Sequence, residues 1–365
     1  MTRKLLIVAC LFAIATLLIG AEPPAVTIMT QNMNAGTDLT YAVYGLLGYI
    51  DLPTGVEMTY EEVQASNIPQ RAAMVAAKVA DKKPDLLTLQ EATLWRTGPT
   101  AGGATTVFAD QIQSLLASLA RKGVPYDIVA VNNLADLALP KASGGFLRYT
   151  DRDALLIRAD LRRPDFHLSD VHADIFDSAY SLGGLQVPAG WISVMVHLDD
   201  RQFRLLTTHL QSPVSGDPTS ITVQTAQAQQ LLRVARNSTV SAAIGTVPVV
   251  IAGDFNSDAI LGEKGPGPDN TGTAAMIRAA GYMDSWSLAG LGAGVTWPFY
   301  QQDQFPPPPF FTQSVPYERI DLIFEQGLDV LSVERVLEPG SSANTWPYDA
   351  SDHCGVIAEL EFKRR

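Results

Sequence analysis

The chain alternates short apolar runs, rich in β-branched residues, with segments whose apolar residues recur at helical spacing. The runs predict β-strands over 26–30, 85–90, 126–131, 154–157, 191–196, 203–208, 247–252, 319–324 and 355–362. The helical spacing predicts helices over 69–80, from Phe108 to Gly123, and over 224–235 and 274–280. Because no helix separates the runs at 191–208, part of the sheet is expected to be antiparallel. The pattern indicates an α/β chain.

Segments rich in Gly, Pro and Ser lie between these elements and are predicted to be loops. They cover 36–56, 97–106, 212–222, 258–272 and 288–316. Loops of this length in a compact domain are usually functional or mobile. No change of composition marks a linker, so residues 22–365 are expected to form one domain.

The N-terminus has the layout of a secretory signal peptide. Arg3 and Lys4 precede an apolar run over 5–19, and Gly20 and Ala21 follow it. We predict a signal peptide over 1–21 and a secreted or periplasmic protein. The alternative is an uncleaved membrane anchor, although the run is shorter than the roughly 20 residues that span a bilayer.

Cysteine usage follows from this prediction. Removal of the leader takes away Cys10 and leaves Cys354 alone, so no disulfide within the chain is expected. Cys354 begins the apolar run of the last strand and is expected to be a small buried hydrophobic residue.

The charge bears on possible partners. Hydrophobic residues make up 47% of the chain and charged residues 18%, as in globular proteins, and the net charge is −12. A protein that binds nucleic acid over its whole surface would normally carry the opposite sign. A compact site can still bind a phosphate if it holds a cation.

Polar residues suited to metal and phosphate chemistry stand at the ends of five predicted strands. They are Asn32, Glu91, His209, Asp254 with Asn256, and Asp352 with His353, the last pair preceding its strand. The end of a strand fixes the position of a side chain that projects into a cleft. Carboxylate, amide and imidazole donors together suit a hard cation and a phosphoester.

Each of these residues also has an ordinary structural interpretation. Asn32 could cap a turn, Gly253–Asn256 could form a β-turn, and Asp352 with His353 could cap a helix or lie on the surface. Glu91 could be a surface acid, and His209 could be a satisfied core histidine. Only the combination, in this order along the chain, is specific.

The combination resembles the endonuclease/exonuclease/phosphatase superfamily. The resemblance lies in Thr30–Asn34, Pro84–Glu91, Thr208–Leu210, Gly253–Asn256, Arg319–Phe324 and Ser351–His353, and it covers residues 26 to 362. It implies a four-layer α/β/β/α sandwich of two packed, mostly antiparallel sheets, with the active site at one sheet edge. Residues 22–365 would be the catalytic domain.

The resemblance also implies roles for individual residues. Glu91, Asn32 and Asp352 would hold Mg²⁺, with Mn²⁺ or Ca²⁺ as alternatives. Asp254 would activate the attacking water, with Asn256 beside it. His353 would donate a hydrogen bond to the phosphoryl group, and Asp321 would orient its imidazole. His209 would be the general acid for the leaving group.

The substrate is left open, because the variable loops that are expected to select it in this family match nothing recognisable; they lie at 36–66, 136–150, 212–222 and 288–316. Nucleic acid would need a cationic track, for which Arg148, Arg152 and Arg158 are candidates, although all three could be ordinary surface charges. A phospholipid headgroup would need transient membrane contact, for which the segment 297–311 is a candidate. A phosphomonoesterase and a non-catalytic binding module remain as alternatives. We expect a monomer.

Overall fold

The computed structural model describes residues 23–238, 240–241, 245–260, 270–298, 300–302, 311–313, 316–336 and 350–364. The predicted signal peptide lies outside them, as does most of the segment 297–311. Among the described residues, no helix has the length and apolar content needed to cross a membrane.

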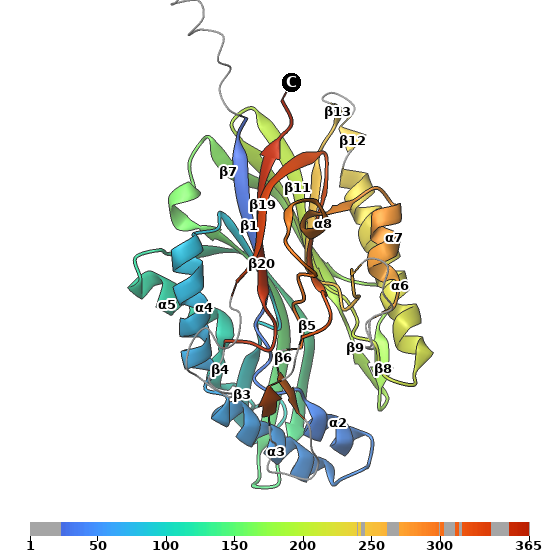
Figure 1. The fold of residues 1–365 in the computed structure, drawn as a ribbon. Helices are drawn as coiled ribbons and strands as arrows, with labels where there is room; N and C mark the ends of the chain where they lie inside the picture. Colours follow the sequence, from blue (N-terminus) through green and yellow to red (C-terminus); the bar gives the residue numbers. More distant parts are fainter. Residues whose placement is uncertain are drawn as a thin grey trace, which may run out of the picture.

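Two sheets packed face to face form the centre of the molecule (Figure 1). The first has the order β19-β20-β1-β2-β6-β3-β4, with β5 also paired to β6. Its strands are β1 Ala25–Asn32, β2 Leu86–Gln90, β3 Leu94–Gly98, β4 Thr106–Asp110, β5 Tyr126–Pro140, β6 Phe146–Arg158, β19 Leu328–Val336 and β20 Gly355–Phe362.

The second sheet has the order β15-β18-β14-β11-β10-β7. Its strands are β7 Phe166–Ile175, β10 Gly190–Leu198, β11 Arg201–His209, β14 Val249–Asp254, β15 Met283–Asp284 and β18 Asp321–Gln326. Only β1–β2 and β11–β14 are parallel among the pairs described for the two sheets. Three two-stranded ribbons are separate: β8 Tyr180–Leu182 with β9 Leu185–Val187, β12 Val240–Ser241 with β13 Gly245–Thr246, and β16 Tyr300–Gln302 with β17 Phe311–Gln313.

Helices surround the two sheets. They are α2 Thr40–Leu46, α3 Leu52–Ala65, α4 Ile68–Lys82, α5 Gln111–Arg121, α6 Pro218–Ser238, α7 Thr273–Ala279 and α8 Ser285–Ala289, with a short 3₁₀ helix, η1 Ala159–Leu161. Helices α4 and α5 lie on one side of the molecule and α6 and α7 on the other (Figure 1).

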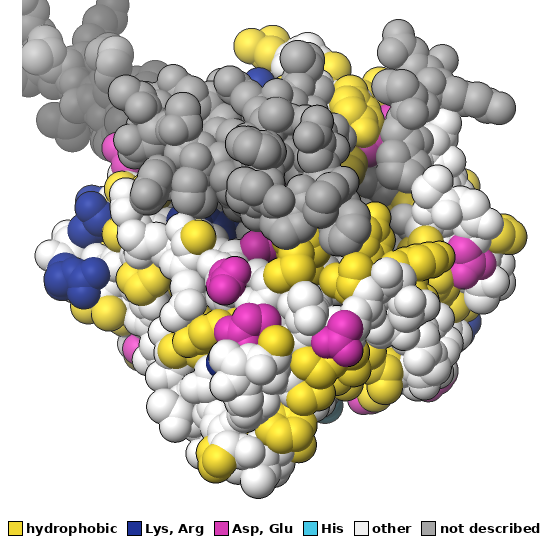
Figure 2. Space-filling view, turned by 90° about the horizontal axis from the view of Figure 1, so that it is seen from below, with side chains coloured by type: hydrophobic (Ala, Val, Ile, Leu, Met, Phe, Trp, Pro, Cys, Tyr) yellow, Lys and Arg dark blue, Asp and Glu magenta, His cyan; other side chains and the backbone are white. Residues whose placement is uncertain are grey.

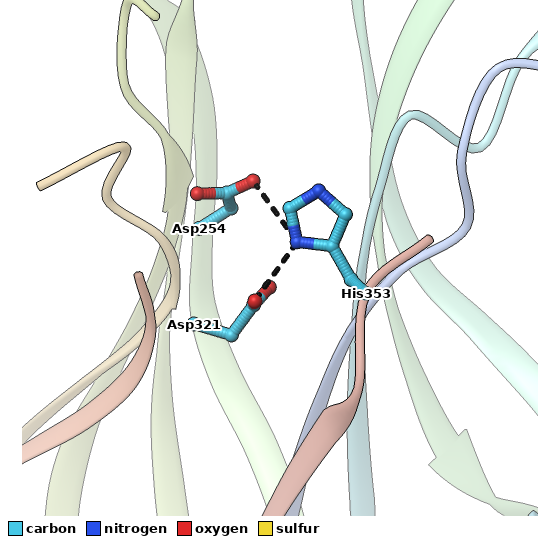
Figure 3. Close-up of side chains that lie close together, drawn as sticks. All are labelled: Asp254, Asp321 and His353. Atoms are coloured by element: carbon cyan, nitrogen blue, oxygen red, sulfur yellow. Dashed lines mark hydrogen bonds and ion pairs between the residues drawn. The ribbon is translucent and has the colours of Figure 1, made fainter. Parts of the chain in front are cut away.

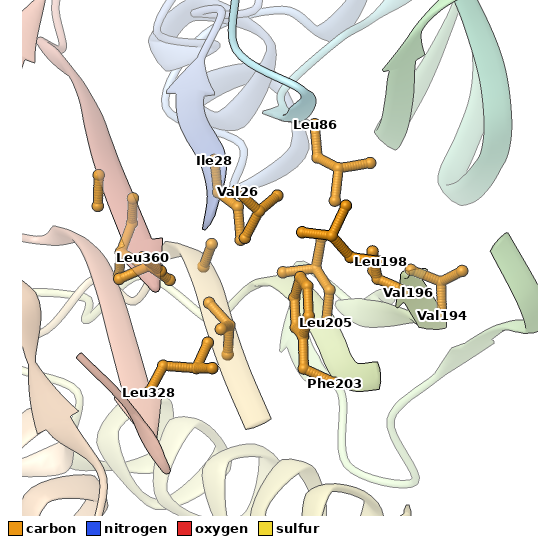
Figure 4. Close-up of a cluster of buried hydrophobic side chains, with 14 of the residues drawn as sticks. Val26, Ile28, Leu86, Val194, Val196, Leu198, Phe203, Leu205, Leu328 and Leu360 are labelled. Carbon is orange, nitrogen blue, oxygen red and sulfur yellow. The ribbon is translucent and has the colours of Figure 1, made fainter. Parts of the chain in front are cut away.

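Three apolar clusters hold these layers together. Alternate residues of β1, such as Val26 and Ile28, meet residues of β11, such as Phe203 and Leu205, in the core between the sheets (Figure 4). A second cluster joins α4 and α5 to the first sheet, and a third joins α6 and α7 to the second. The predicted α/β fold with two packed, mostly antiparallel sheets is therefore confirmed.

The N-terminal third differs most from the sequence prediction. Helices α2 and α3 occupy the predicted loop 36–56, so that prediction is wrong. Asp51 caps α3, since its carboxylate accepts a hydrogen bond from the Thr54 backbone N–H at 3.2 Å, and Pro53 stands in the first turn. These start signals favour a helix despite the weak apolar periodicity of the segment.

Two further predictions need correction. Phe108 belongs to β4, and helix α5 starts only at Gln111, because Asp110 caps it by accepting from the Gln113 N–H at 3.2 Å. The segment 136–150 is the paired end of the long β5–β6 hairpin rather than a loop. The buried position of Cys354 is confirmed.

Candidate active site

Strand pairing brings the predicted residues to one edge of the two sheets. His209 ends β11 and lies opposite Asp254, the last residue of the parallel strand β14. Asp254 in turn lies opposite Asp321, the first residue of the antiparallel strand β18. Asn32 ends β1 in the facing sheet, where Gln90 is its register partner. Residues far apart in sequence are thus fixed next to one another by backbone hydrogen bonds.

The parallel pair β11–β14 approaches closely because of Gly253. A Cβ built on this residue would lie 2.0 Å from the Thr208 carbonyl oxygen, so no larger residue fits without a shift of the strands. The glycine lets His209 and Asp254 emerge side by side.

Asp254, Asp321 and His353 form a compact cluster (Figure 3). His353 Nδ1 lies 2.9 Å from Asp321 Oδ2 and 3.8 Å from Asp254 Oδ2. One donor atom of each residue lies within 4.8 Å of the others. Since an ionised carboxylate can only accept, Nδ1 carries the hydrogen and donates to Asp321, which leaves Nε2 free to point elsewhere.

Asn32 connects this cluster to Glu91. Its side-chain amide donates to Glu91 Oε1 at 3.0 Å and to Asp254 Oδ2 at 3.0 Å. Glu91 has a φ of 50°, a left-handed conformation that is uncommon for this residue. The Ala35 N–H also donates to Glu91 Oε2 at 2.8 Å, which fixes the carboxylate.

Asn256 and His209 complete the group around Asp254. The Asn256 N–H donates to Asp254 Oδ1 at 2.9 Å, and its side chain donates to the Leu210 carbonyl at 2.9 Å. His209 Nε2 lies 3.6 Å from Asp254 Oδ2. The Asp254 carboxylate is therefore surrounded by donors on several sides, which orients it firmly.

These side chains surround a cavity of about 440 Å³. Its acidic lining residues are Asp38, Glu91, Asp151, Asp254 and Asp352. His209 and His353 are its only basic residues, and no Lys or Arg from the described part of the chain lines it. On the face that carries α2 and α3, Asp and Glu lie among hydrophobic side chains, while most visible Lys and Arg gather towards one edge (Figure 2).

Burial and the neighbouring charges shift the pKa values of the cluster. Burial raises the pKa of Asp321 to about 6, although the charge of His353 opposes this. Burial alone would lower the pKa of His353, but the charges of Asp321 and Asp352 outweigh it and raise the pKa well above the usual value. The pair therefore keeps a proton on the imidazole at neutral pH.

His209 is held in its charged form in a similar way. Burial opposes protonation, yet the charges of Asp254, Glu91, Asp153 and Asp151 raise the pKa of His209 to about 9. Burial raises the pKa of Asp151 to about 6, and that of Asp153 well above its usual value. His209 is thus an acid that still holds its proton at neutral pH, as a proton donor must.

A family model matches most of the chain. The model of the endonuclease/exonuclease/phosphatase family matches residues 29–353, which includes each of the strand ends described above. The chain belongs to the endonuclease/exonuclease/phosphatase family.

Solved structures of this family share the fold. A family member from Bacteroides thetaiotaomicron is 14% identical with a TM-score of 0.55, covering 94% of this chain and 100% of that one. One from Beutenbergia cavernae is 20% identical with a TM-score of 0.53, covering 93% and 72%. A mannosyl-6-phosphatase from Bacteroides thetaiotaomicron is 14% identical with a TM-score of 0.52, covering 92% and 100%. No curated protein matches the chain significantly.

The site residues predicted from the family resemblance converge in space. The cavity is lined by Glu91, His209, Asp254, Asn256, Asp352 and His353. Asn32 and Asp321 are buried behind it and hydrogen-bonded to lining residues. Their individual roles remain predictions.

The proposed cationic track for nucleic acid is not present at the cavity. Arg148 pairs with Asp136 at 2.5 Å, and Arg152 is buried against Asp110 at 2.6 Å. Arg158 pairs with Asp160 at 2.7 Å. All three arginines stabilise neighbouring strands and loops, and none of them lines the cavity.

Two acids beside this site were not predicted from the sequence. Asp151 lines the cavity, and Asp153 is fully buried, with neither of its oxygens hydrogen-bonded. Both lie on β6, just before the apolar run 154–157. Two acids that lead into a buried strand were the available signal, and it was overlooked because the family motifs do not include them.

The donors present fit the divalent cation that this family implies. Two carboxylates, Glu91 and Asp254, converge on the single amide of Asn32. Asp321 also has a buried oxygen without a hydrogen-bond partner. Because the acids of the cavity outnumber its two histidines, a bound cation would relieve an otherwise costly excess of negative charge. Oxygen donors of this kind suit Mg²⁺, Mn²⁺ or Ca²⁺.

Proposed function

We propose that this protein is an Mg²⁺-dependent phosphoester hydrolase that acts on phosphodiesters. The observation that carries the proposal is the position of Asp254, which lies within hydrogen-bonding range of Asn32 and within 4 Å of His209 and His353. Hydrolysis at phosphorus needs charge neutralisation, an oriented water and a protonated leaving group. The cavity contains a candidate for each.

Glu91, Asn32 and Asp352 are the proposed cation-binding residues, with Mn²⁺ or Ca²⁺ as alternatives. When bound, the cation would supply Lewis-acid polarisation of a phosphoryl oxygen. Glu91 is suited to this because its carboxylate borders the cavity and is oriented by Ala35 and Asn32.

Asp254 is the proposed base. Its carboxylate would accept the proton of a water molecule placed for in-line attack, and Asn256 would hold that water or a phosphoryl oxygen. His353 would donate from Nε2 to the negative charge that develops on phosphorus. Asp321 is a positioning residue, because it contacts Nδ1 and keeps the ring charged and correctly turned.

His209 is the proposed general acid. The attacking oxygen forms a bond to phosphorus, the bond from phosphorus to the ester oxygen breaks, and that oxygen takes the proton of His209. The raised pKa of this residue keeps the proton available at neutral pH.

Hydrolysis of bis-p-nitrophenyl phosphate tests the proposal. We expect turnover with Mg²⁺ that EDTA abolishes, and a loss of about 100-fold or more in kcat for Glu91→Gln and Asp254→Asn. The matched controls are Glu61→Gln and Asp81→Asn, which change exposed residues outside the cavity. Turnover that is insensitive to EDTA, or full activity in both site variants, would contradict the proposal.

We also propose secretion through residues 1–21. N-terminal sequencing of the protein recovered from the medium or periplasm should begin near residue 22. A mature chain that still begins at Met1 would favour the membrane anchor instead.

A further inference from the structure

A second cavity adjoins the proposed active site. It has a volume of about 150 Å³ and lies between helix α2, strand β5 and the β8–β9 hairpin. Leu39, Tyr149, Asp151 and Val187 line both this cavity and the one that holds Asp254 and His353. A single molecule that contacts these four residues could therefore occupy both cavities.

The second cavity is almost entirely apolar. Its walls include Ala42, Val43 and Leu46 of α2, Leu137 of β5 and Leu182 of the hairpin. All of these side chains are half-buried, so the cavity lies near the surface rather than deep in the core. An apolar space of this volume is large enough for a group the size of benzene, or about six carbons.

Two polar side chains of the wall already have hydrogen-bond partners, and the unpartnered Asp151 Oδ1 lies in the part shared with the active-site cavity. The Thr59 hydroxyl donates to the Gly55 carbonyl at 3.0 Å, and the Trp95 indole N–H donates to the Ala35 carbonyl at 2.9 Å. A polar ligand would lose its hydration here and gain little in return, whereas a hydrocarbon would gain from burial.

The hairpin and the helix close over the space together. A Cβ built on Gly183, at the hairpin tip, would lie 3.2 Å from the Leu46 carbonyl oxygen, so the tip approaches α2 closely. Leu47 and Tyr49, which follow α2, are 43% and 73% exposed. Apolar surface thus continues from the cavity to the outside of the molecule.

The charge of the neighbouring site narrows the choice of ligand. Its cavity has acidic side chains and no Lys or Arg from the described residues, and the chain carries a net charge of −12. A polyanion such as a nucleic acid would meet repulsion beyond the single phosphate that a cation could neutralise. A substrate with one phosphate and an apolar substituent meets no such obstacle.

We propose that the α2–β5–hairpin cavity binds the hydrocarbon part of a lipid phosphoester while its phosphate lies at the Asp254–His353 site. The proposal rests on the hydrolase function above and names its substrate class. It relies on α2 and the hairpin and not on the segment 297–311, most of which lies outside the described residues.

Methyl alkyl phosphates with methyl, butyl, hexyl and decyl chains test the proposal, because only the apolar part changes. Loss of the diester is followed by ³¹P NMR with Mg²⁺. We expect kcat/KM to rise about threefold or more per methylene up to roughly six carbons and then to level off. Turnover of bis-p-nitrophenyl phosphate is measured in parallel, because hydrolysis of this activated ester reports on the hydrolase function whether or not its ring enters the second cavity.

The variant Ala42→Leu should fill the cavity from α2. We expect it to lower kcat/KM for the hexyl ester by about tenfold or more while leaving the dimethyl ester unchanged. The matched control is Ala138→Leu, a half-buried alanine of β5 that does not line the cavity. If Ala42→Leu does not fold, Leu182→Gln, which changes the hairpin wall of the cavity, is expected to give the same effect.

The outcomes separate the two proposals. Equal rates along the alkyl series, or no turnover of it, together with hydrolysis of bis-p-nitrophenyl phosphate would overturn the lipid proposal and leave the hydrolase intact. No hydrolysis of any ester would overturn both. Faster hydrolysis of DNA than of the hexyl ester would assign the site to nucleic acid instead.

Discussion

At the scale of single residues, the two histidines of the site differ in how carboxylates contact them. His353 is bound through Nδ1 to the buried Asp321, so it stays charged and in one orientation. Within the described part of the chain, the His209 side chain has no hydrogen-bonded carboxylate and is held charged by the acids around it, of which Asp254 lies at 3.6 Å. The first arrangement suits a fixed hydrogen-bond donor and the second suits an acid that gives up its proton.

A leaving-group comparison should reveal the role of His209. His209→Ala should lower the hydrolysis of methyl hexyl phosphate by about 100-fold or more, since an alkoxide must be protonated as it leaves. Bis-p-nitrophenyl phosphate should lose less than about tenfold, because nitrophenolate leaves without a proton. Asp254→Asn is the control and should impair both substrates. Equal losses for both esters in His209→Ala would rule out the acid role.

The free energy of unfolding should depend on pH through His209. Its pKa rises from 6.5 in the unfolded chain to about 9 in the fold, so protonation stabilises the folded protein fully below pH 6.5. That contribution is lost as the pH rises through about 9. Urea unfolding in EDTA should therefore show a larger loss of stability between pH 7 and pH 10 for the wild type than for His209→Gln. A parallel decline in both proteins would count against the charged His209.

At the scale of elements, the site residues that could be predicted from the sequence are those at the ends of strands. Asn32, Glu91 and Asp254 each terminate an apolar run, so their place at a sheet edge could be inferred without coordinates. Asp151 and Asp153 could be recognised only as acids that lead into an apolar run, because they lie within β6, where Asp153 is buried and pairs with β5. Helix α3 was missed because its start signals are local while its apolar face is weakly periodic, and helix α2 has no side-chain cap at its start.

The close approach of β11 and β14 gives a prediction for backbone packing. Gly253→Ala should destabilise the protein by about 3 kcal/mol or more and reduce activity, because its Cβ would lie 2.0 Å from the Thr208 oxygen. Gly102→Ala is the control, since a Cβ there meets no atom within 4 Å. Urea denaturation measures both. A stable and fully active Gly253→Ala protein would show that the strands can move apart freely.

At the scale of the whole molecule, negative charge surrounds a site for an anionic group. With a net charge of −12, the protein repels a polyanion at long range, while a cation bound in the cavity can attract a single phosphate at short range. The three arginines considered for a nucleic-acid track are each paired with an aspartate. We therefore expect the molecule to favour small or singly charged substrates over polymers.

Salt dependence checks this electrostatic argument. Any hydrolysis of DNA should become faster as KCl rises from 20 to 200 mM, roughly the range over which the Debye length falls from about 20 to 7 Å, because repulsion is screened. A cationic nuclease would show the opposite slope. Methyl hexyl phosphate, with one charge, should change little and serves as the control. A rate on DNA that falls steeply with salt would indicate a cationic track elsewhere.

The register of the second sheet decides whether the site residues of a folded chain come together. His209, Asp254 and Asp321 occupy one rung across three neighbouring strands. Side chains alternate between the faces of a strand, so a slip of β14 by one residue would turn Asp254 away from both neighbours. If these residues carry the proposed hydrolysis, we expect misregistered molecules to be inert even when compact, so that the specific activity of a preparation falls with the fraction of chains whose central strands are misaligned.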